Sequence, residues 1–122
     1  MSTIVYVEDM EAALAFYRDL LGFGVTFRFP DEGPPAFVAL EQGISLALVV
    51  DGQIGAHGQP MRLRESRQFE LCVYTDDVDK AVGELRAHGV TVLAEPADQP
   101  WGERMAYVTD PQGNPVMLCA PL

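Results

Sequence analysis

The two halves of this chain repeat each other. Residues 7–14 are echoed by residues 75–82, 68 positions later, and residues 41–48 by residues 111–118, 70 positions later. Such a repeat constrains the fold before any local assignment, because each copy is one structural unit that has to bury its apolar face against a neighbour. Two copies of one curved sheet also enclose a space between them, so the repeat predicts a pocket.

Each copy shows the same order of elements: strand, helix, then three strands. Alternating apolar positions predict the strands, and apolar residues at helical spacing predict one amphipathic helix per copy. Asp9 and Asp77 stand where N-caps are expected, and Gly22 and Gly89 end the helices. The expected strands are 3–7, 25–29, 36–40 and 44–50, then 69–74, 90–94, 105–109 and 116–120; the expected helices are 10–21 and 78–88.

This order of elements predicts the topology. A right-handed crossover through the helix makes the first two strands of each copy parallel, and two hairpins bring the fourth strand back parallel to the first. One face of each sheet then packs on its helix. The fold class expected is α+β, with tandem βαβββ modules forming mixed curved sheets around a cleft. The 122 residues are expected to form a single domain, 1–122, with half-modules about 1–50 and 68–122 and a linker at 51–67.

The chain is strongly acidic, with a net charge of −10. This charge argues against nucleic acid and anionic membranes as partners, because their phosphates need Lys and Arg. It serves either solubility or the attraction of a cationic ligand. No run approaches the roughly 18 apolar residues of a membrane span, and acidic residues stand at Glu8 and Asp9, where a signal peptide would be apolar. Two cysteines make no disulfide framework, so a cytoplasmic protein with reduced thiols is expected.

Two signatures carry a resemblance to a known family. The run Phe-Tyr-Arg-Asp-x-Leu-Gly-Phe at 16–23 and the run Asp-Pro-x-Gly-Asn at 110–114 resemble the vicinal oxygen chelate superfamily. That superfamily includes glyoxalase I, extradiol dioxygenases, fosfomycin-modifying enzymes and bleomycin resistance proteins. The run Gln-Pro-Trp-Gly-Glu-Arg at 99–104 is similar to a segment of the bleomycin resistance branch. The resemblance covers essentially the whole chain, but its signatures are structural and leave the function open.

In metal-dependent members of that superfamily, the ligands occupy the first and fourth strands of each copy. Carried over position by position, the resemblance implies ligand positions at Ser2, Ala47, Glu70 and Met117. A divalent first-row ion needs about three oxygen or imidazole ligands, and only Glu70 supplies a carboxylate. His57 falls in the linker and His88 at a helix C-terminus, so neither completes the set. No metal and no cofactor are expected.

Strand alternation assigns the side chains to two faces. The helix-facing set is apolar and consists of Val5, Val7, Leu71, Val73, Val116 and Leu118. The opposite face is expected to carry Tyr, Met, Cys and Ile side chains with one acid, the usual composition of a small-molecule site. The residues expected to bind a ligand are Trp101, Glu70, Met117, Tyr74, Tyr6, Phe37 and Cys72. Cys72 and Cys119 are expected side by side on parallel strands, as inert lining.

Several of these side chains leave more than one interpretation open. A carboxylate on a mainly apolar strand needs a partner or water. Glu70 therefore forms a salt bridge with Arg104 or Arg28, anchors a ligand amine or hydroxyl, or acts as a general base. Trp101 either packs in the core or forms a stacking wall for a flat ligand. A similar choice, between core or dimer interface and ligand contact, applies to Phe27, Phe29 and Phe37.

The sequence thus favours a metal-independent small-molecule binding protein that sequesters an antibiotic or another aromatic or cationic compound, as the resemblance to the bleomycin resistance branch implies. The alternative is a glyoxalase-like lyase, isomerase or dioxygenase with an atypical metal site or with Glu70 as acid and base. A third hypothesis is a module whose pocket serves assembly or a host pathway. Similar proteins pair their sheets across subunits, so a homodimer is expected. Whether the segment 51–67 gates the pocket stays open.

Overall fold

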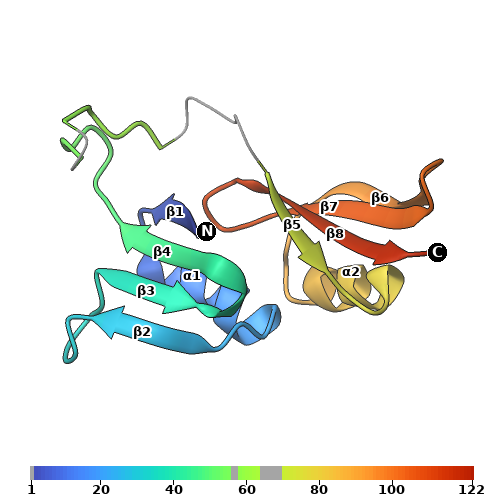
Figure 1. Cartoon of the computed structure of the whole chain (residues 1–122), viewed down its shortest axis with the longest axis horizontal. Coiled ribbons are helices and arrows are strands. Elements are labelled where there is room, and N and C mark those ends of the chain that lie inside the picture. Colours follow the sequence, from blue (N-terminus) through green and yellow to red (C-terminus); the bar gives the residue numbers. More distant parts are fainter. Residues whose placement is uncertain (1, 56–57, 64–69) are drawn as a thin grey trace. The chain divides into compact units, whose positions relative to one another are not determined.

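The computed structural model describes residues 2–55, 58–63 and 70–122 (Figure 1). The expectations for His57, for Phe69 and for the end of the linker at 64–67 lie outside the described residues. The chain divides into two compact units, Met1–Ser66 and Arg67–Leu122, and each contains one copy of the repeat.

The first unit is a four-stranded sheet with a short helical segment. Its strands lie in the order β1-β4-β3-β2. β1 pairs with β4 in parallel, whereas β3 is antiparallel to both β4 and β2. The elements in chain order are β1 (Thr3–Val7), α1 (Met10–Leu14), η1 (Ala15–Leu20), β2 (Val25–Phe29), β3 (Phe37–Leu40), η2 (Glu41–Gly43) and β4 (Ile44–Leu48).

The second unit follows the same plan. Its strands lie in the order β5-β8-β7-β6, with β5 parallel to β8 and with β7 antiparallel to β8 and β6. The two sheets confirm the α+β fold class and the predicted return of each fourth strand beside the first. The elements are β5 (Leu71–Tyr74), α2 (Val78–Ala87), β6 (Val92–Asp98), β7 (Glu103–Thr109) and β8 (Pro115–Pro121).

Both helical segments begin at the predicted caps. Oδ1 of Asp9 accepts a hydrogen bond from the backbone N–H of Ala12 at 3.0 Å, and Oδ1 of Asp77 accepts one from that of Lys80, also at 3.0 Å. Each bond satisfies a donor that the first helical turn leaves without a partner. After α2, Gly89 adopts φ of 84°, a left-handed conformation that ends a helix and favours glycine.

The first helix differs from its prediction. The apolar spacing predicts one α-helix over 10–21, but the segment is α-helical only through Leu14 and continues as a π-helix. There the N–H of Leu21 donates to the carbonyl oxygen of Phe16, five residues back, at 2.9 Å. Phe16 and Tyr17 are both buried, so the wider π-helical turn coincides with two adjacent aromatic side chains in the core.

The hairpin after α2 is longer than the sequence predicts. A strand is expected at 90–94 and a loop from Pro96, but β6 continues to Asp98. β6 is the edge strand of its sheet and pairs irregularly with β7, so Pro96 is tolerated there. β7 correspondingly begins at Glu103, earlier than expected. The turn between the two strands therefore shrinks to residues 99–102.

The core of each unit lies between the sheet and its helix. In the second unit α2 contacts β6, β7 and β8, and Figure 1 shows it against one face of the sheet. Burying a large apolar side chain stabilises a fold by roughly 1.5–3 kcal/mol. Among residues 70–122, no helix covers the other face of this sheet. The residues predicted to face the helices are all buried: Val5, Val7, Leu71, Val73, Val116 and Leu118.

The described part of the predicted linker belongs to the first unit. Met61 and Leu63 are buried in a cluster with Val49. The backbone N–H of Leu63 also donates to Oδ1 of Asp51 at 3.0 Å. The described part of this segment is therefore anchored by apolar contacts and a hydrogen bond. Within the described residues, no helix is long and apolar enough to cross a membrane.

Candidate functional site

The helix-free face of the second sheet collects most of the predicted site residues. β5, β8 and β7 lie side by side, and alternate residues of each strand point to this face. Sulfur and hydroxyl groups therefore gather across three neighbouring strands. The two rows that the register produces are Cys72, Met117 and Tyr107, then Tyr74, Cys119 and Met105.

Glu103, at the start of β7, accepts two hydrogen bonds on this face. Its Oε1 accepts one from Nε1 of Trp101 at 2.9 Å, and its Oε2 accepts one from the thiol of Cys119, with Sγ 3.1 Å away. Both donors are neutral, so neither compensates the negative charge of the carboxylate. Among the residues that the structure describes, Glu103 forms no salt bridge with a basic side chain.

Trp101 lies in the turn between β6 and β7. The N–H of Gln99 donates to the carbonyl oxygen of Glu103 at 2.7 Å, and the N–H of Gly102 donates to that of Gln99 at 3.1 Å. The side chain of Trp101 is 64% exposed, so the core-packing interpretation is wrong. An exposed ring whose N–H is already bonded suits the stacking interpretation, which stays a prediction.

Glu70 has a neutral partner. Its Oε2 accepts a hydrogen bond from the hydroxyl of Tyr107 at 2.8 Å. The predicted salt bridge with Arg104 is wrong, because the side chain of Arg104 leaves β7 on the helix-covered side and pairs with two aspartates there. Arg28 belongs to the first unit, where its guanidinium donates to two backbone carbonyl oxygens. No described basic side chain pairs with the carboxylate of Glu70.

Four acidic groups on this face hold their protons more firmly than usual, and the nearby charges of Cys72 and Glu103 raise the pKa of one of them, Tyr74. The hydrogen bond to Glu70, followed by burial, raises the pKa of Tyr107. Burial, followed by the hydrogen bond to Glu103, raises the pKa of Cys119 to about 11. Burial, followed by the charge of Glu103, raises the pKa of Cys72. At neutral pH these groups are therefore protonated, and Tyr107 and Cys119 act as neutral donors to the two carboxylates.

These shifts predict slow thiol chemistry. At pH 8, a thiol with a pKa of about 11 is ionised to about one part in a thousand, against roughly a quarter for an ordinary thiol. We expect iodoacetamide to label Cys119 at least 100-fold more slowly than the urea-unfolded protein, with a rate that still rises above pH 10. Peptide mass spectrometry at several pH values measures both rates. Labelling that levels off near pH 8.5 would contradict the assigned protonation, and Glu103→Gln should move the profile of Cys119 to lower pH.

Two predicted site residues lie in the first unit. Tyr6 and Phe37 occupy the helix-free face of its sheet, and both are in register with Ala47 between them. Phe27 and Phe29 are exposed, so the core interpretation is wrong for both. The ring of Phe27 lies 6.3 Å from that of Phe37, edge to face. The assignment of Tyr6 and Phe37 to a ligand site stays a prediction.

The four positions implied as metal ligands do not suit a hard divalent ion. Glu70 offers one carboxylate, already bonded to a phenol, and Met117 offers a thioether, which suits soft metals. Ser2 offers a weak hydroxyl ligand and Ala47 none. Across residues 2–55, 58–63 and 70–122, no group of three or more His, Cys, Asp or Glu side chains is placed to hold a metal ion.

The sequence reasoning missed Glu103, Met105 and Tyr107. The repeat contained a signal for Tyr107, which stands 70 positions after Phe37 and pairs with Met117 as Phe37 pairs with Ala47. Glu103 and Met105 share the face with Tyr107 through the two-residue period of a strand. Glu103 lies outside the expected strand 105–109, because the early start of β7 has no sequence signal of its own.

A family model and solved structures both resemble this chain over almost its whole length. The model of the Glyoxalase/Bleomycin resistance protein/Dioxygenase superfamily matches residues 2–118. The crystal structure of TnmS3, an antibiotic binding protein from Streptomyces sp. CB03234, is 30% identical, with a TM-score of 0.69 over 98% of this chain and 93% of that one. That of a lactoylglutathione lyase from Agrobacterium tumefaciens is 26% identical, with a TM-score of 0.69 over 98% and 90%.

Two curated relatives from mycobacteria are much longer than this chain. These relatives, from Mycobacterium tuberculosis and Mycobacterium bovis, carry a provisional glyoxylase name and are 29% identical over 103 residues. The match covers 84% of this chain but 36% of the length of those relatives, about a third. Their whole-protein activity is therefore no guide to this chain by itself.

Proposed function

Because the chain belongs to the Glyoxalase/Bleomycin resistance protein/Dioxygenase superfamily, we propose that it is a small-molecule binding protein. It sequesters an aromatic, cationic compound, such as an antibiotic, without a metal ion and without chemistry. The observation that carries this proposal is the pairing of Trp101 with Glu103. An exposed aromatic ring there is bonded to a carboxylate that has no basic partner among the described residues.

The chemistry of this face favours a flat cation. A cation near an aromatic ring gains roughly 0.5–2 kcal/mol, and a hydrogen bond to a charged group contributes roughly 1.5–3 kcal/mol. Glu70 supplies a second anionic point on the same face, and the sulfur-bearing side chains between the two carboxylates supply a polarizable, mainly apolar surface. The net charge of −10 adds long-range attraction for cations.

The names of the similar structures support this proposal in part. TnmS3 is named as an antibiotic binding protein, which favours binding without chemistry. The lactoylglutathione lyase is an enzyme by name, which favours the alternative. Because relatives at comparable identity carry both kinds of name, the proposal rests on the side chains of this chain.

Three compounds with one ring system test the charge preference. 9-Aminoacridine is cationic at neutral pH, acridine is mostly neutral and acridine-9-carboxylate is anionic. We expect isothermal titration calorimetry to rank their affinities in that order, with at least tenfold between the cation and the anion. Glu70→Gln and Glu103→Gln should each reduce the preference for the cation. Equal affinities, or no binding of 9-aminoacridine at millimolar concentration, would contradict the proposal.

A second candidate function is an acid–base enzyme built on Glu70. The hydrogen bond between Glu70 and Tyr107, at 2.8 Å, supports this candidate, because proton transfer needs a carboxylate and a phenol within that distance. Mass spectrometry of a bound compound after long incubation separates the two functions. A sequestering protein returns the compound unchanged, whereas an enzyme returns a product whose formation Glu70→Gln abolishes.

A homodimer and a cytoplasmic location complete the proposal. Ile4, Phe27 and Phe29 are exposed in the first unit, and a second copy is a partner that would cover such apolar surface. Sedimentation equilibrium measures the association, and a monomer at tens of micromolar would contradict the dimer.

A further inference from the structure

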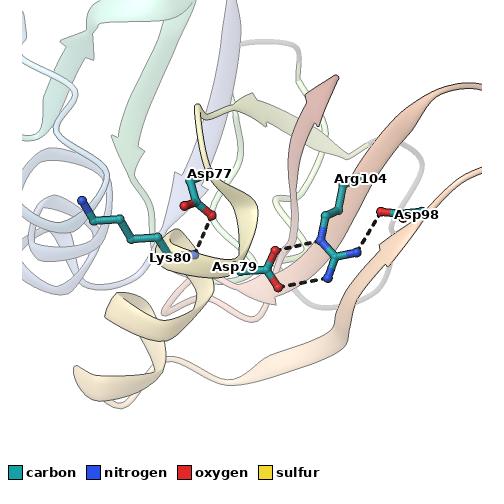
Figure 2. Close-up of polar contacts among 5 residues, drawn as sticks. All are labelled: Asp77, Asp79, Lys80, Asp98 and Arg104. Atoms are coloured by element: carbon teal, nitrogen blue, oxygen red, sulfur yellow. Dashed lines mark hydrogen bonds and ion pairs between the residues drawn. The ribbon is translucent and has the colours of Figure 1, made fainter. Parts of the chain in front are cut away.

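Arg104 connects α2 to the end of β6. Its Nε lies 2.7 Å from Oδ2 of Asp79, and its terminal nitrogens lie 3.0 Å from Oδ1 of Asp79 and 2.8 Å from Oδ1 of Asp98 (Figure 2). Asp79 stands in the first turn of α2, and Asp98 is the last residue of β6. One guanidinium therefore holds a helix and a strand together through three hydrogen bonds, two of them in the fork geometry that only arginine offers.

The same residue borders the turn that carries Trp101. Asp98 and Arg104 form the last pair of the β6–β7 ladder, and this pair closes the segment 99–103, which consists of the turn and Glu103. The turn is also bonded to the residue after β8, because the N–H of Leu122 donates to the carbonyl oxygen of Gly102 at 3.0 Å. The exposed ring of Trp101 has little core packing to hold it, so its position depends on the backbone of this turn and on its hydrogen bond to Glu103.

Arg104 and Glu103 are neighbours in sequence that point to opposite faces of β7. Glu103 bonds the ring N–H of Trp101 on the helix-free face, and Arg104 bonds Asp79 and Asp98 on the helix-covered face. Hydrogen bonds to Asp79 and Asp98 raise the pKa of Arg104, and the hydrogen bond to Arg104 lowers the pKa of Asp79, so Arg104 and Asp79 form a stable ion pair at neutral pH. The start of β7 is thus held from both sides.

We propose that Arg104 is a positioning residue, which acts through Asp79 and Asp98 to hold the turn at 99–102 and so sets the place of Trp101. Partly exposed ion pairs contribute little to stability, so the role of Arg104 lies in geometry more than in holding the unit folded. The expected effect of Arg104 on ligand affinity rests on the function proposed above, whereas its expected effect on the position of Trp101 does not.

Trp101 is the single tryptophan of the chain, so tryptophan fluorescence reports this turn alone. We expect Arg104→Gln to increase acrylamide quenching and to lower the fluorescence anisotropy of Trp101. Arg104→Lys should resemble Arg104→Gln, because an ammonium cannot reproduce the fork to Asp79. Asp79→Asn should have the same effect, and the double variant should add little to either single one.

The matched control is Arg86→Gln. Arg86 pairs with Glu95, so it also joins α2 to β6, but away from the turn. It should leave the fluorescence of Trp101 unchanged. A merely structural role predicts that both arginine variants shift the melting temperature alike and that neither changes quenching. Quenching of a folded Arg104→Gln protein that equals the wild-type value would overturn the proposal.

The affinity for 9-aminoacridine separates this inference from the proposed function. If both hold, Arg104→Gln weakens binding by about tenfold and Arg86→Gln does not. If the wild-type protein binds no acridine while the fluorescence of Trp101 responds to Arg104, the proposed function fails and the positioning role stands. If acridine binds and neither readout responds to Arg104, the positioning role fails and the proposed function stands.

Discussion

Trp101→Ala lowers the affinity for 9-aminoacridine by about 30-fold, equivalent to about 2 kcal/mol, which is the scale of an aromatic residue at the centre of a binding site. The free energy of unfolding should change by no more than about 0.5 kcal/mol, because the side chain is 64% exposed. Calorimetric titration and urea unfolding measure the two quantities on the same samples. A large loss of affinity with unchanged stability would identify Trp101 as a ligand contact.

Two further variants make that result specific. Trp101→Phe keeps an aromatic ring but loses the N–H that Glu103 accepts, so we expect an intermediate affinity. Leu93→Ala removes an exposed apolar side chain from β6 of the same sheet and should leave the affinity unchanged. If Leu93→Ala weakens binding as much as Trp101→Ala, the ligand recognises general apolar surface and the assignment of Trp101 is wrong.

The topology could be predicted from the sequence because two independent signals agree. The repeat specifies the same order of elements twice, and the two-residue period specifies which side of each strand is buried. The register between first and fourth strands could not be predicted. In the first unit, Tyr6 is in register with Ala47. In the second unit, the residue 70 positions after Ala47 is Met117, and it is in register with Cys72, which stands 66 positions after Tyr6. The register of the second unit is therefore shifted by two residues from the one that the 68- and 70-residue offsets of the repeat would give. A shift of two residues leaves every side chain on the same face of the sheet, so the pattern of apolar residues does not reveal it.

The candidate site could be predicted less completely than the fold. Alternation predicts Glu70, Cys72, Tyr74 and Met117 on one face, and the register agrees for the last three, while the hydrogen bond to Tyr107 agrees for Glu70. The partner of Glu70 was missed, because charge alone favoured an arginine over a tyrosine. Which of several arginines meets a given carboxylate depends on the face from which each side chain leaves its strand. For Arg104 that face follows from the start of β7, and strand boundaries are the least determined feature of a sequence.

Leu118→Ala destabilises the protein by about 2–5 kcal/mol, the range for removing a large aliphatic side chain from a core. Leu118 lies on β8, a central strand of its sheet, in register with Val73 and Ala106, and is 1% exposed. The cavity would lie between the sheet and α2, where the packing of neighbouring strands leaves little room for collapse. Urea unfolding followed by circular dichroism measures the loss.

The neighbouring Met117→Ala is the matched control, since Met117 is the preceding residue of β8 and points to the helix-free face. It should cost less than half as much as Leu118→Ala, because Met117 is only half-buried. Equal costs would mean that the helix-free face is covered in solution as tightly as the core.

Leu46→Ala makes the corresponding cavity in the first unit, where Leu46 is fully buried. If the two units unfold together, Leu46→Ala and Leu118→Ala shift one common transition; if they unfold separately, each variant shifts its own, and the two halves of the repeat are independent in stability.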